Sequence, residues 1–357
     1  MSITFGCALS RLRFATFGCA LSRLRFAGLL RALVYLWLLG VTAQAQQQLT
    51  PLKVELVTRA VSKTPVLIAY DRGIYKKYGL DVTLWLPPGE FPGAIELGGG
   101  KPMDSPDISV DGGVPMVAAI LANRGPKRLQ IATTDCEVRF SIIGQKNMKS
   151  LQDLKGKRLG ISNDGAMTGF IYRALAKRMG WVPGKDFIVV ERAQRFDDLK
   201  AGKADAFIAD DRYMALAKAE GYPVLADTST WKQAIAGNGV RVEWNWIKDP
   251  KNRDLAMRFL KATFEGMAIY FNNRQETLRV LAKYHGMTDA KVANAVYEEG
   301  LKMSREMSPC VQGFKDMFSL GYPAELQKYK PSDFFDESFV AELKKNGFID
   351  TVYRTVK

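Results

Sequence analysis

Residues 64–82, TPVLIAYDRGIYKKYGLDV, indicate the fold of this chain more clearly than any other stretch. Pro65 suits the first position of a helix, because the N–H that proline lacks would have no intrahelical partner there. Apolar and aromatic side chains then recur at helical spacing as far as Tyr78. Gly79 stands where a left-handed residue often ends a helix, and residues 80–84 alternate as a strand does. The stretch predicts a helix that leads directly into a strand.

Strands and helices alternate along most of the chain. A first run of this kind covers residues 52–133, and a second run begins at residues 139–143. From residue 252 onward the pattern is mainly helical. This alternation predicts an α/β protein with helices on both faces of its sheets. Besides residues 80–84, the predicted strands are residues 52–57, 106–110, 129–133, 139–143, 158–161, 187–190 and 204–209, with a further extended segment over 240–246.

The first 45 residues are predicted to be a secretory leader. They contain five arginines and no acid, followed by an apolar run over residues 32–41 and then Ala43-Gln44-Ala45, so cleavage is expected before Gln46. The apolar run is shorter than the roughly 20 residues that span a bilayer; a membrane anchor is the alternative. Residues 4–15 and 16–27 are identical, which we interpret as a short duplication, or a start placed too far upstream.

Removal of the leader leaves 312 residues, a length that suggests about two domains. The formal net charge falls from +14 to +9, because five arginines leave. The remaining positive charges are dispersed among acids, without the basic runs and interleaved aromatics of a nucleic-acid site, so no nucleic-acid partner is expected. Two cysteines remain, Cys136 and Cys310. An oxidising compartment would permit a disulfide, but the sequence leaves open whether the two lie within reach.

Common catalytic and metal-binding motifs are absent from the sequence. It has no phosphate-binding G-x-x-x-x-G-K-[ST] loop, no G-x-S-x-G and no H-E-x-x-H. Its one histidine, His285, is predicted at the end of a helix, where a positive charge favours the dipole. We therefore expect no enzymatic activity, no cofactor and no metal.

One arrangement recurs along the chain as a candidate ligand-binding site: a strand, then a small polar turn, then a helix N-terminus. This arrangement offers unpaired N–H groups to a ligand. Such turns also simply cap helices. Arg139 is a candidate partner for a carboxylate or sulfonate, or pairs with Glu137. Asp210 and Asp211 could accept from a ligand amine or cap the next helix. The full set of predicted ligand-binding residues is Ser62, Lys63, Thr64, Asp111, Gly112, Gly113, Arg139, Asn163, Gly165, Ala166, Thr168, Asp210, Asp211 and Trp244, of which Trp244 could instead belong to the core.

Several stretches together resemble the solute-binding proteins of bacterial ABC importers, in the nitrate/sulfonate/taurine and thiamine-precursor group. The most specific is DLKGKRLGIS at residues 153–162. The others are residues 65–82, 107–119, LKAGKADA at 199–206 and DFFDESFVAELKKNGFID at 333–350.

The resemblance implies the two-lobed type 2 periplasmic-binding fold, in which each lobe is a mixed sheet flanked by helices. Residues 46–137 and 238–357 would form lobe 1, with a mostly helical C-terminal part. Residues 138–237 would form lobe 2, inserted in lobe 1. The chain would cross between the lobes at about residues 135–139 and 236–241, and two crossings make a hinge.

The resemblance also implies a function. We expect a monomeric periplasmic protein that delivers a small organic anion or zwitterion, sulfonate-, nitrate- or carboxylate-like, to an ABC permease in the inner membrane. One alternative is a relative of the same fold that binds or synthesises a pyrimidine or thiamine precursor. The other is a sensory binding module without transport.

Overall fold

The computed structural model describes residues 48–89 and 92–356. The predicted leader and the duplicated segment within it lie outside these residues. From Leu49 onward the chain forms one compact unit. Within the described ranges, every helix is too short or too polar to cross a membrane.

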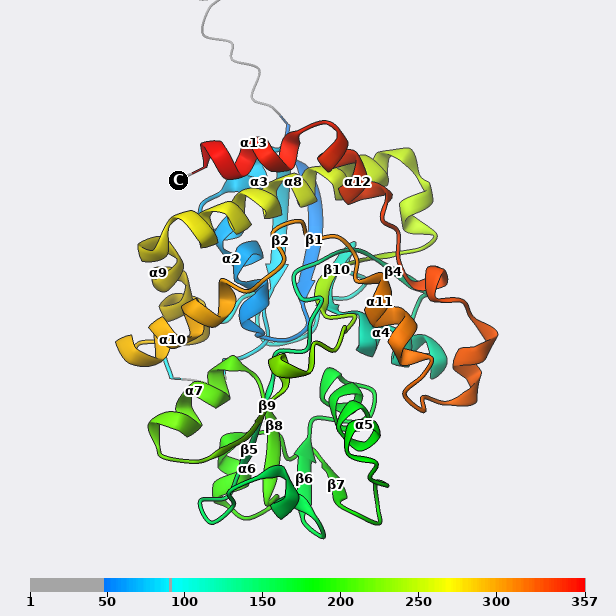
Figure 1. The fold of residues 1–357 in the computed structure, drawn as a ribbon. Coiled ribbons are helices and arrows are strands. Elements are labelled where there is room, and N and C mark those ends of the chain that lie inside the picture. The colour runs from blue at the N-terminus through cyan, green and yellow to red at the C-terminus, as the bar shows by residue number, and fades with distance from the viewer. Residues whose placement is uncertain (1–47, 90–91, 357) are drawn as a thin grey trace, which may run out of the picture. The chain divides into compact units, whose positions relative to one another are not determined.

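Two five-stranded sheets organise this unit (Figure 1). The first has the order β2-β1-β3-β10-β4 and the second the order β7-β6-β8-β5-β9. Each sheet is mixed, because its fourth strand in the spatial order, β10 or β5, runs antiparallel to its neighbours. The first sheet contains β1 (Thr50–Leu56), β2 (Leu80–Trp85), β3 (Ile108–Gly112), β4 (Arg128–Thr133) and β10 (Asn238–Glu243), and the second contains β5 (Ser141–Gly144), β6 (Arg158–Ile161), β7 (Ile188–Glu191), β8 (Ala206–Ala209) and β9 (Val224–Asp227).

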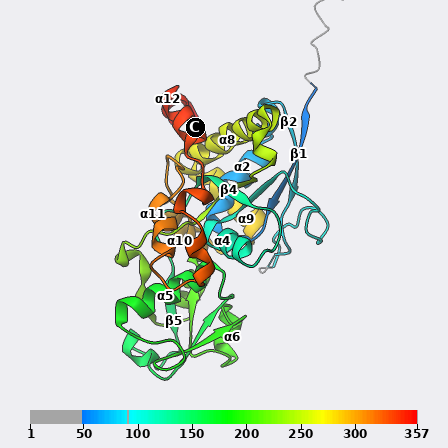
Figure 2. The ribbon, with the colours of Figure 1, turned by 90° about the vertical axis from the view of Figure 1, so that its right-hand side faces the viewer.

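Strands β5 to β9 all lie between β4 and β10 in the sequence, so the second sheet is an insertion in the chain of the first. Below, "lobe 1" and "lobe 2" mean the first and second sheets with their attached helices. Lobe 1 carries α2 (Thr64–Asp71), α3 (Ile74–Lys77), α4 (Gly113–Leu121), α8 (Pro250–Asn272), α9 (Arg274–His285), α10 (Ala290–Gly300), α11 (Val311–Met317), α12 (Ser338–Lys345) and α13 (Phe348–Thr355). Lobe 2, drawn in green, carries α5 (Met167–Met179) and α6 (Phe196–Lys200), both labelled in Figure 2, and α7 (Asp211–Ala219), labelled in Figure 1.

Short 3-10 turns link many of these elements. They are η1 (Val61–Lys63), η2 (Leu151–Leu154), η3 (Thr228–Trp231), η4 (Trp246–Lys248), η5 (Ala324–Lys328) and η6 (Pro331–Phe334). The predicted α/β class, with a mainly helical part after residue 252, is confirmed.

Two predicted elements differ in detail. The helix expected over residues 64–78 is broken into α2 and α3 at Gly73, which adopts a left-handed conformation with φ of 66°. Gly79 has φ of 70°, as its helix-ending place predicted. The extended segment expected over residues 240–246 ends at Glu243, because the chain turns there into η4. Strand β9 was not predicted, since its four residues show no alternation.

Close helix packing builds the core of lobe 1. Helix α8 lies against α2, and a Cβ atom added at Gly266 would stand 2.1 Å from the carbonyl oxygen of Pro65. Large apolar residues of α8, such as Phe259 and Phe264, are fully buried beside this contact. Such burial is the main favourable contribution to folding.

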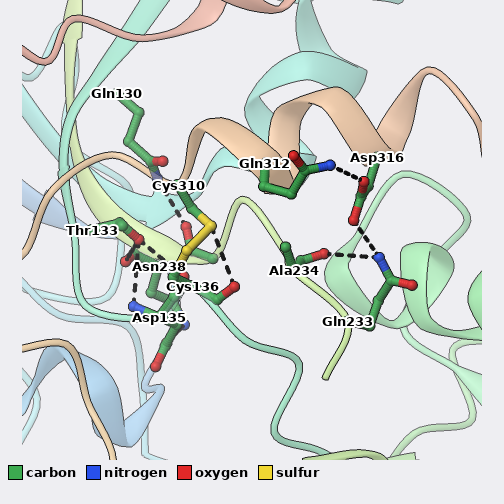
Figure 3. Close-up of a disulfide and its surroundings, with 11 residues drawn as sticks. Gln130, Thr133, Asp135, Cys136, Gln233, Ala234, Asn238, Cys310, Gln312 and Asp316 are labelled. Carbon is green, nitrogen blue, oxygen red and sulfur yellow. Dashed lines mark hydrogen bonds between the residues drawn. A yellow bond between two sulfur atoms is a disulfide. The ribbon is translucent and has the colours of Figure 1, made fainter. Parts of the chain in front are cut away.

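The two crossings between the lobes lie antiparallel to one another. The N–H of Ile235 donates to the carbonyl of Cys136 at 3.0 Å, and the N–H of Val138 donates to that of Gln233 at 2.9 Å. A disulfide joins Cys136 to Cys310, whose Cα atoms are 5.2 Å apart (Figure 3). It therefore ties the first crossing to the residue that precedes α11.

We expect the double variant Cys136→Ser/Cys310→Ser to lose about 2–4 kcal/mol of unfolding free energy, because the bridge restrains an unfolded chain across 174 positions. Urea titration of the mature protein measures this. Two thiols open to alkylation in the non-reduced, denatured mature protein would contradict the disulfide.

Candidate functional site

A cavity of about 1100 Å³ lies between the two lobes. Its walls come from the segments that follow β1, β6 and β8, together with β3 and the crossings. These are carboxyl ends of strands, the usual place for ligands in open α/β sheets. Eight of the predicted residues line it: Ser62, Asp111, Arg139, Asn163, Ala166, Thr168, Asp210 and Asp211.

A second cavity of about 1110 Å³ adjoins the first. It lies beside α4 and the 162–165 turn, and Tyr322 closes part of it. Both cavities share Pro115, Ser162, Asn163, Gln194 and Arg195 as lining residues. Predicted Gly165 lines this second cavity and not the first.

Lys63 lies behind the cavity wall and holds one of its carboxylates. Its side chain is 1 % exposed, and its Nζ donates to Thr58 Oγ1 at 2.6 Å and to Asp111 Oδ1 at 3.1 Å. Burial lowers the pKa of Lys63 to about 8, against the opposing effect of Asp111. Burial alone would raise the pKa of Asp111, but Lys63 and Arg241 outweigh it and lower that pKa. Lys63 therefore fixes Asp111 as an ionised wall residue.

Thr64 and His285 form a second buried contact behind the wall. The Thr64 hydroxyl donates to the Val61 carbonyl at 2.6 Å and lies 3.2 Å from His285 Nε2. Burial, helped by the charges of Arg212 and Arg59, lowers the pKa of His285 to about 3. His285 does end α9, as predicted, but it is a neutral buried ring, so the expected cationic interaction with the helix dipole is wrong.

The turn before α4 serves the hinge. The N–H groups of Gly113 and Val114 donate to the carbonyls of Gly237 and Ala236 at 3.0 and 3.1 Å. A Cβ atom at Gly112 would stand 2.9 Å from Pro115, and one at Gly113 would stand 2.8 Å from Ala236. The predicted Gly113 therefore lets the second crossing approach α4, whereas Gly112 leaves room for Pro115 of α4 itself. The first N–H groups of this helix are already satisfied.

The N-terminus of α5 does face the cavity. Ala166 is its N-cap and supplies no side-chain acceptor, and Met167 and Thr168 line the cavity. The Thr168 hydroxyl accepts from the Ser162 N–H at 3.1 Å and so holds the preceding turn in place. Helix N–H groups left without a side-chain cap suit an anionic group of a ligand.

Arg139 is paired within the hinge. Its guanidinium bonds to the Asp135 carboxylate and donates from Nη1 to the Glu299 carbonyl at 3.1 Å. Burial lowers the pKa of Arg139, but Asp135 and Asp211 outweigh it and raise that pKa. Its ion-pair partner is thus Asp135 and not the proposed Glu137, which lies 3.7 Å from Lys232.

The two aspartates at the start of α7 have different roles. Asp210 is the N-cap, accepting from the N–H groups of Arg212 and Tyr213, and it pairs with the Arg212 guanidinium at 2.7 Å. Asp211 lines the cavity, and no residue of the described part of the chain bonds to its carboxylate. Burial raises the pKa of Asp211 to about 7, despite the opposing effect of Arg139. Asp211 is an acceptor that folding leaves unused.

Trp244 lies outside the cavity. Its side chain is 42 % exposed, and the Nζ atoms of Lys127 and Lys248 stand 5.3 and 3.5 Å from its ring centroid. The reason is that β10 ends one residue before it, which turns Trp244 away from the sheet.

Asn238 and Asp135 are cavity residues that the sequence patterns did not identify. Asn238 begins β10 and lies beside Asp135 (Figure 3). Its Nδ2 donates to Asp135 Oδ2 at 3.3 Å and to Ser62 Oγ at 3.0 Å. Its Oδ1 is buried without a partner among the described residues. Their place could have been noticed in the sequence, because both are polar residues at or beside the predicted crossings between the lobes. Patterns of turns and of catalytic motifs do not take that position into account.

The family model described as NMT1/THI5 like matches residues 61–277, more than half of the chain. None of the curated protein sequences matches.

Solved structures share the fold. The periplasmic nitrate-binding protein NrtA from Synechocystis PCC 6803 is 16 % identical, with a TM-score of 0.63 over 84 % of this chain and 89 % of that one. The periplasmic aliphatic sulphonate binding protein SsuA from Escherichia coli is 17 % identical, with a TM-score of 0.59 over 78 % and 96 %. The desulfurization enzyme DSZB is 14 % identical, with a TM-score of 0.53 over 82 % and 99 %. The predicted two-lobed periplasmic-binding fold is confirmed.

We expect Asp211→Asn to stabilise the ligand-free protein. The folded pKa of Asp211, about 7, lies above its usual 3.8, so ionisation opposes folding above pH 7 and this cost disappears below the unfolded pKa. A difference of one between the folded and unfolded pKa values corresponds to about 1.4 kcal/mol, and we expect a gain of at least about 1 kcal/mol at pH 8 and little change at pH 4. Urea titration at both pH values, with exposed Asp254→Asn as control, measures it. A loss of stability at pH 8 would contradict this environment.

Lys63→Met should cost about 3–5 kcal/mol of unfolding free energy, because it leaves Asp111 buried with a broken ion pair. Arg241 Nη2 lies 3.5 Å from Asp111 Oδ2 and still faces this carboxylate in the variant, so we expect a loss of about 3 kcal/mol. The double variant with Asp111→Asn should recover part of the loss. A single variant within about 1 kcal/mol of the parent, on the scale of an exposed pair, would show that Lys63 does not hold the wall.

Proposed function

The chain belongs to the NMT1/THI5-like family, and from that premise we propose that it is a secreted, periplasmic solute-binding protein for an ABC importer. In this proposal it binds a small organic anion or zwitterion as a monomer and presents it to a permease in the inner membrane.

The observation that carries the proposal is the cavity itself. Ser62 and Asp111 line it from lobe 1, while Ala166, Thr168 and Asp211 line it from lobe 2. A ligand that touches both walls favours the arrangement in which they are closest, so binding would shift an open–closed equilibrium. The volume of about 1100 Å³ lies just above the range for small-molecule sites, about 300–1,000 Å³, which leaves room for closure.

A catalytic role has less support. One similar structure is a desulfurization enzyme, but the described lining residues of the cavity include neither histidine nor cysteine. His285 lies buried behind the wall, and Cys136 and Cys310 are joined to each other. Nucleophilic or general-base chemistry of the usual His or Cys type has no residue to act through in these walls.

The test is a thermal-shift screen of the mature protein against inorganic anions, sulfonates, amino acids, carboxylates and aromatic acids. A ligand that binds only the folded state stabilises it by about 2.7 kcal/mol at 100 times its Kd, so at least one compound should raise the unfolding midpoint. Small-angle X-ray scattering should then show a smaller radius of gyration with that compound. Turnover of a pyrimidine precursor, without any stabilising compound, would favour an enzyme instead.

A further inference from the structure

The described cavity walls carry more acid than base. Seven carboxylates and five cationic side chains line the cavity. The carboxylates are Asp111, Asp135, Glu137, Asp197, Asp210, Asp211 and Glu220, and the cations are Arg59, Arg139, Arg195, Lys200 and Arg212. Three cations outside the lining offset two of these acids: Lys63 and Arg241 pair with Asp111, and Lys232 lies 3.7 Å from Glu137.

Most of these charges already serve the fold. Arg59 donates to three backbone carbonyls, those of Pro87, Tyr284 and Ile95. Asp135 holds Arg139, and Lys200 pairs with Asp197 at 3.2 Å. Hydrogen-bonding capacity left over from such pairing is what a ligand can use.

Asp211 and Asn238 are two lining residues whose acceptor atoms have no partner in the described part of the chain. The Asp211 carboxylate has neither a hydrogen bond nor an ion pair there. Asn238 is 2 % exposed, and its Oδ1 has no donor. The bond from Asn238 Nδ2 to the Asp135 carboxylate fixes the amide orientation, because a carboxylate accepts and does not donate. Asn238 Oδ1 is buried and the Asp211 carboxylate is half-buried. Acceptors in such places call for hydrogen-bond donors, and a negatively charged acceptor favours a positively charged donor.

We propose that the ligand carries a protonated amino group, which pairs with the Asp211 carboxylate and has Asn238 Oδ1 as a further acceptor. This inference rests on the proposed function and specifies its ligand class. The uncapped N-terminus of α5 on the same cavity receives an anionic end, so the ligand is a zwitterion. A compound of this kind supplies the ion-pair partner that Asp211 lacks among the described residues, and it stabilises the closed arrangement of the lobes.

The surroundings of Asp211 set how binding depends on pH. Asp210 precedes it on α7, Asp135 and Arg139 face it from the first crossing, and Glu299 and Tyr270 approach from α10 and α8. Burial raises the pKa of Asp211 to about 7, Arg139 opposes this, and the neighbouring acids add to the increase. Below pH 7 an ammonium group must therefore displace the proton of Asp211, and its affinity falls.

The test compares compounds that differ only in the amino group. Isothermal titration calorimetry of the mature protein would use taurine against ethanesulfonate, β-alanine against propionate, and 4-(aminomethyl)benzoate against 4-methylbenzoate. In any pair that binds, the amino compound should bind at least about tenfold tighter. Its association constant should rise about tenfold per pH unit between pH 5 and 7 and then level off. A tenfold rise per unit is the largest that the release of one proton on binding can produce.

Asp211→Asn should remove both the amino preference and the pH dependence, whereas Asp254→Asn, which changes the net charge equally at an exposed α8 position, should keep both. Equal or tighter binding of the deaminated partners, or an unchanged preference in Asp211→Asn, would overturn the inference and leave the proposed function standing. Failure of every compound to bind would count against the proposed function itself and so against both.

Discussion

The packing of the two interlobe crossings against lobe 1 is the constraint on which the rest of the structure depends. Backbone bonds join the crossings to each other, the N-terminus of α4 binds the second, and a disulfide fixes the first. The Asp135–Arg139 ion pair and Asn238 lie at the same place and line the cavity. Any change in the angle between the lobes must therefore involve residues that also line the cavity, which couples the hinge to the cavity physically.

Much of the fold could be predicted from sequence, because strands and helices alternate with clear periods and Gly79 marks the end of a helix. The site could be predicted only in part. Turns after strands identified Ser62, Asn163 and Thr168, since position after a strand is a local property. Local pattern could not show that α4's first N–H groups bind the second crossing, nor that His285 is buried, because both depend on partners more than 100 residues away.

The polar residues of the cavity fall into two groups, according to whether the fold itself supplies their partners. Asp111, held by Lys63 and Arg241, and Arg139, held by Asp135, are fixed within the fold. Asp211 and Asn238 keep acceptors that nothing in the described chain uses. A protein selected for stability alone would gain by neutralising Asp211, a half-buried carboxylate without an ion-pair partner among the described residues. Keeping it there is consistent with a site whose stability is completed by a ligand.

The most direct measurement is a crystal structure of the mature protein with the compound that raises its unfolding midpoint most. The account predicts density for that compound in the interlobe cavity, touching Ser62 or Asn238 from lobe 1 and the 162–168 turn or Asp211 from lobe 2. Density on the outer surface of one lobe, with the cavity filled only by water, would contradict it.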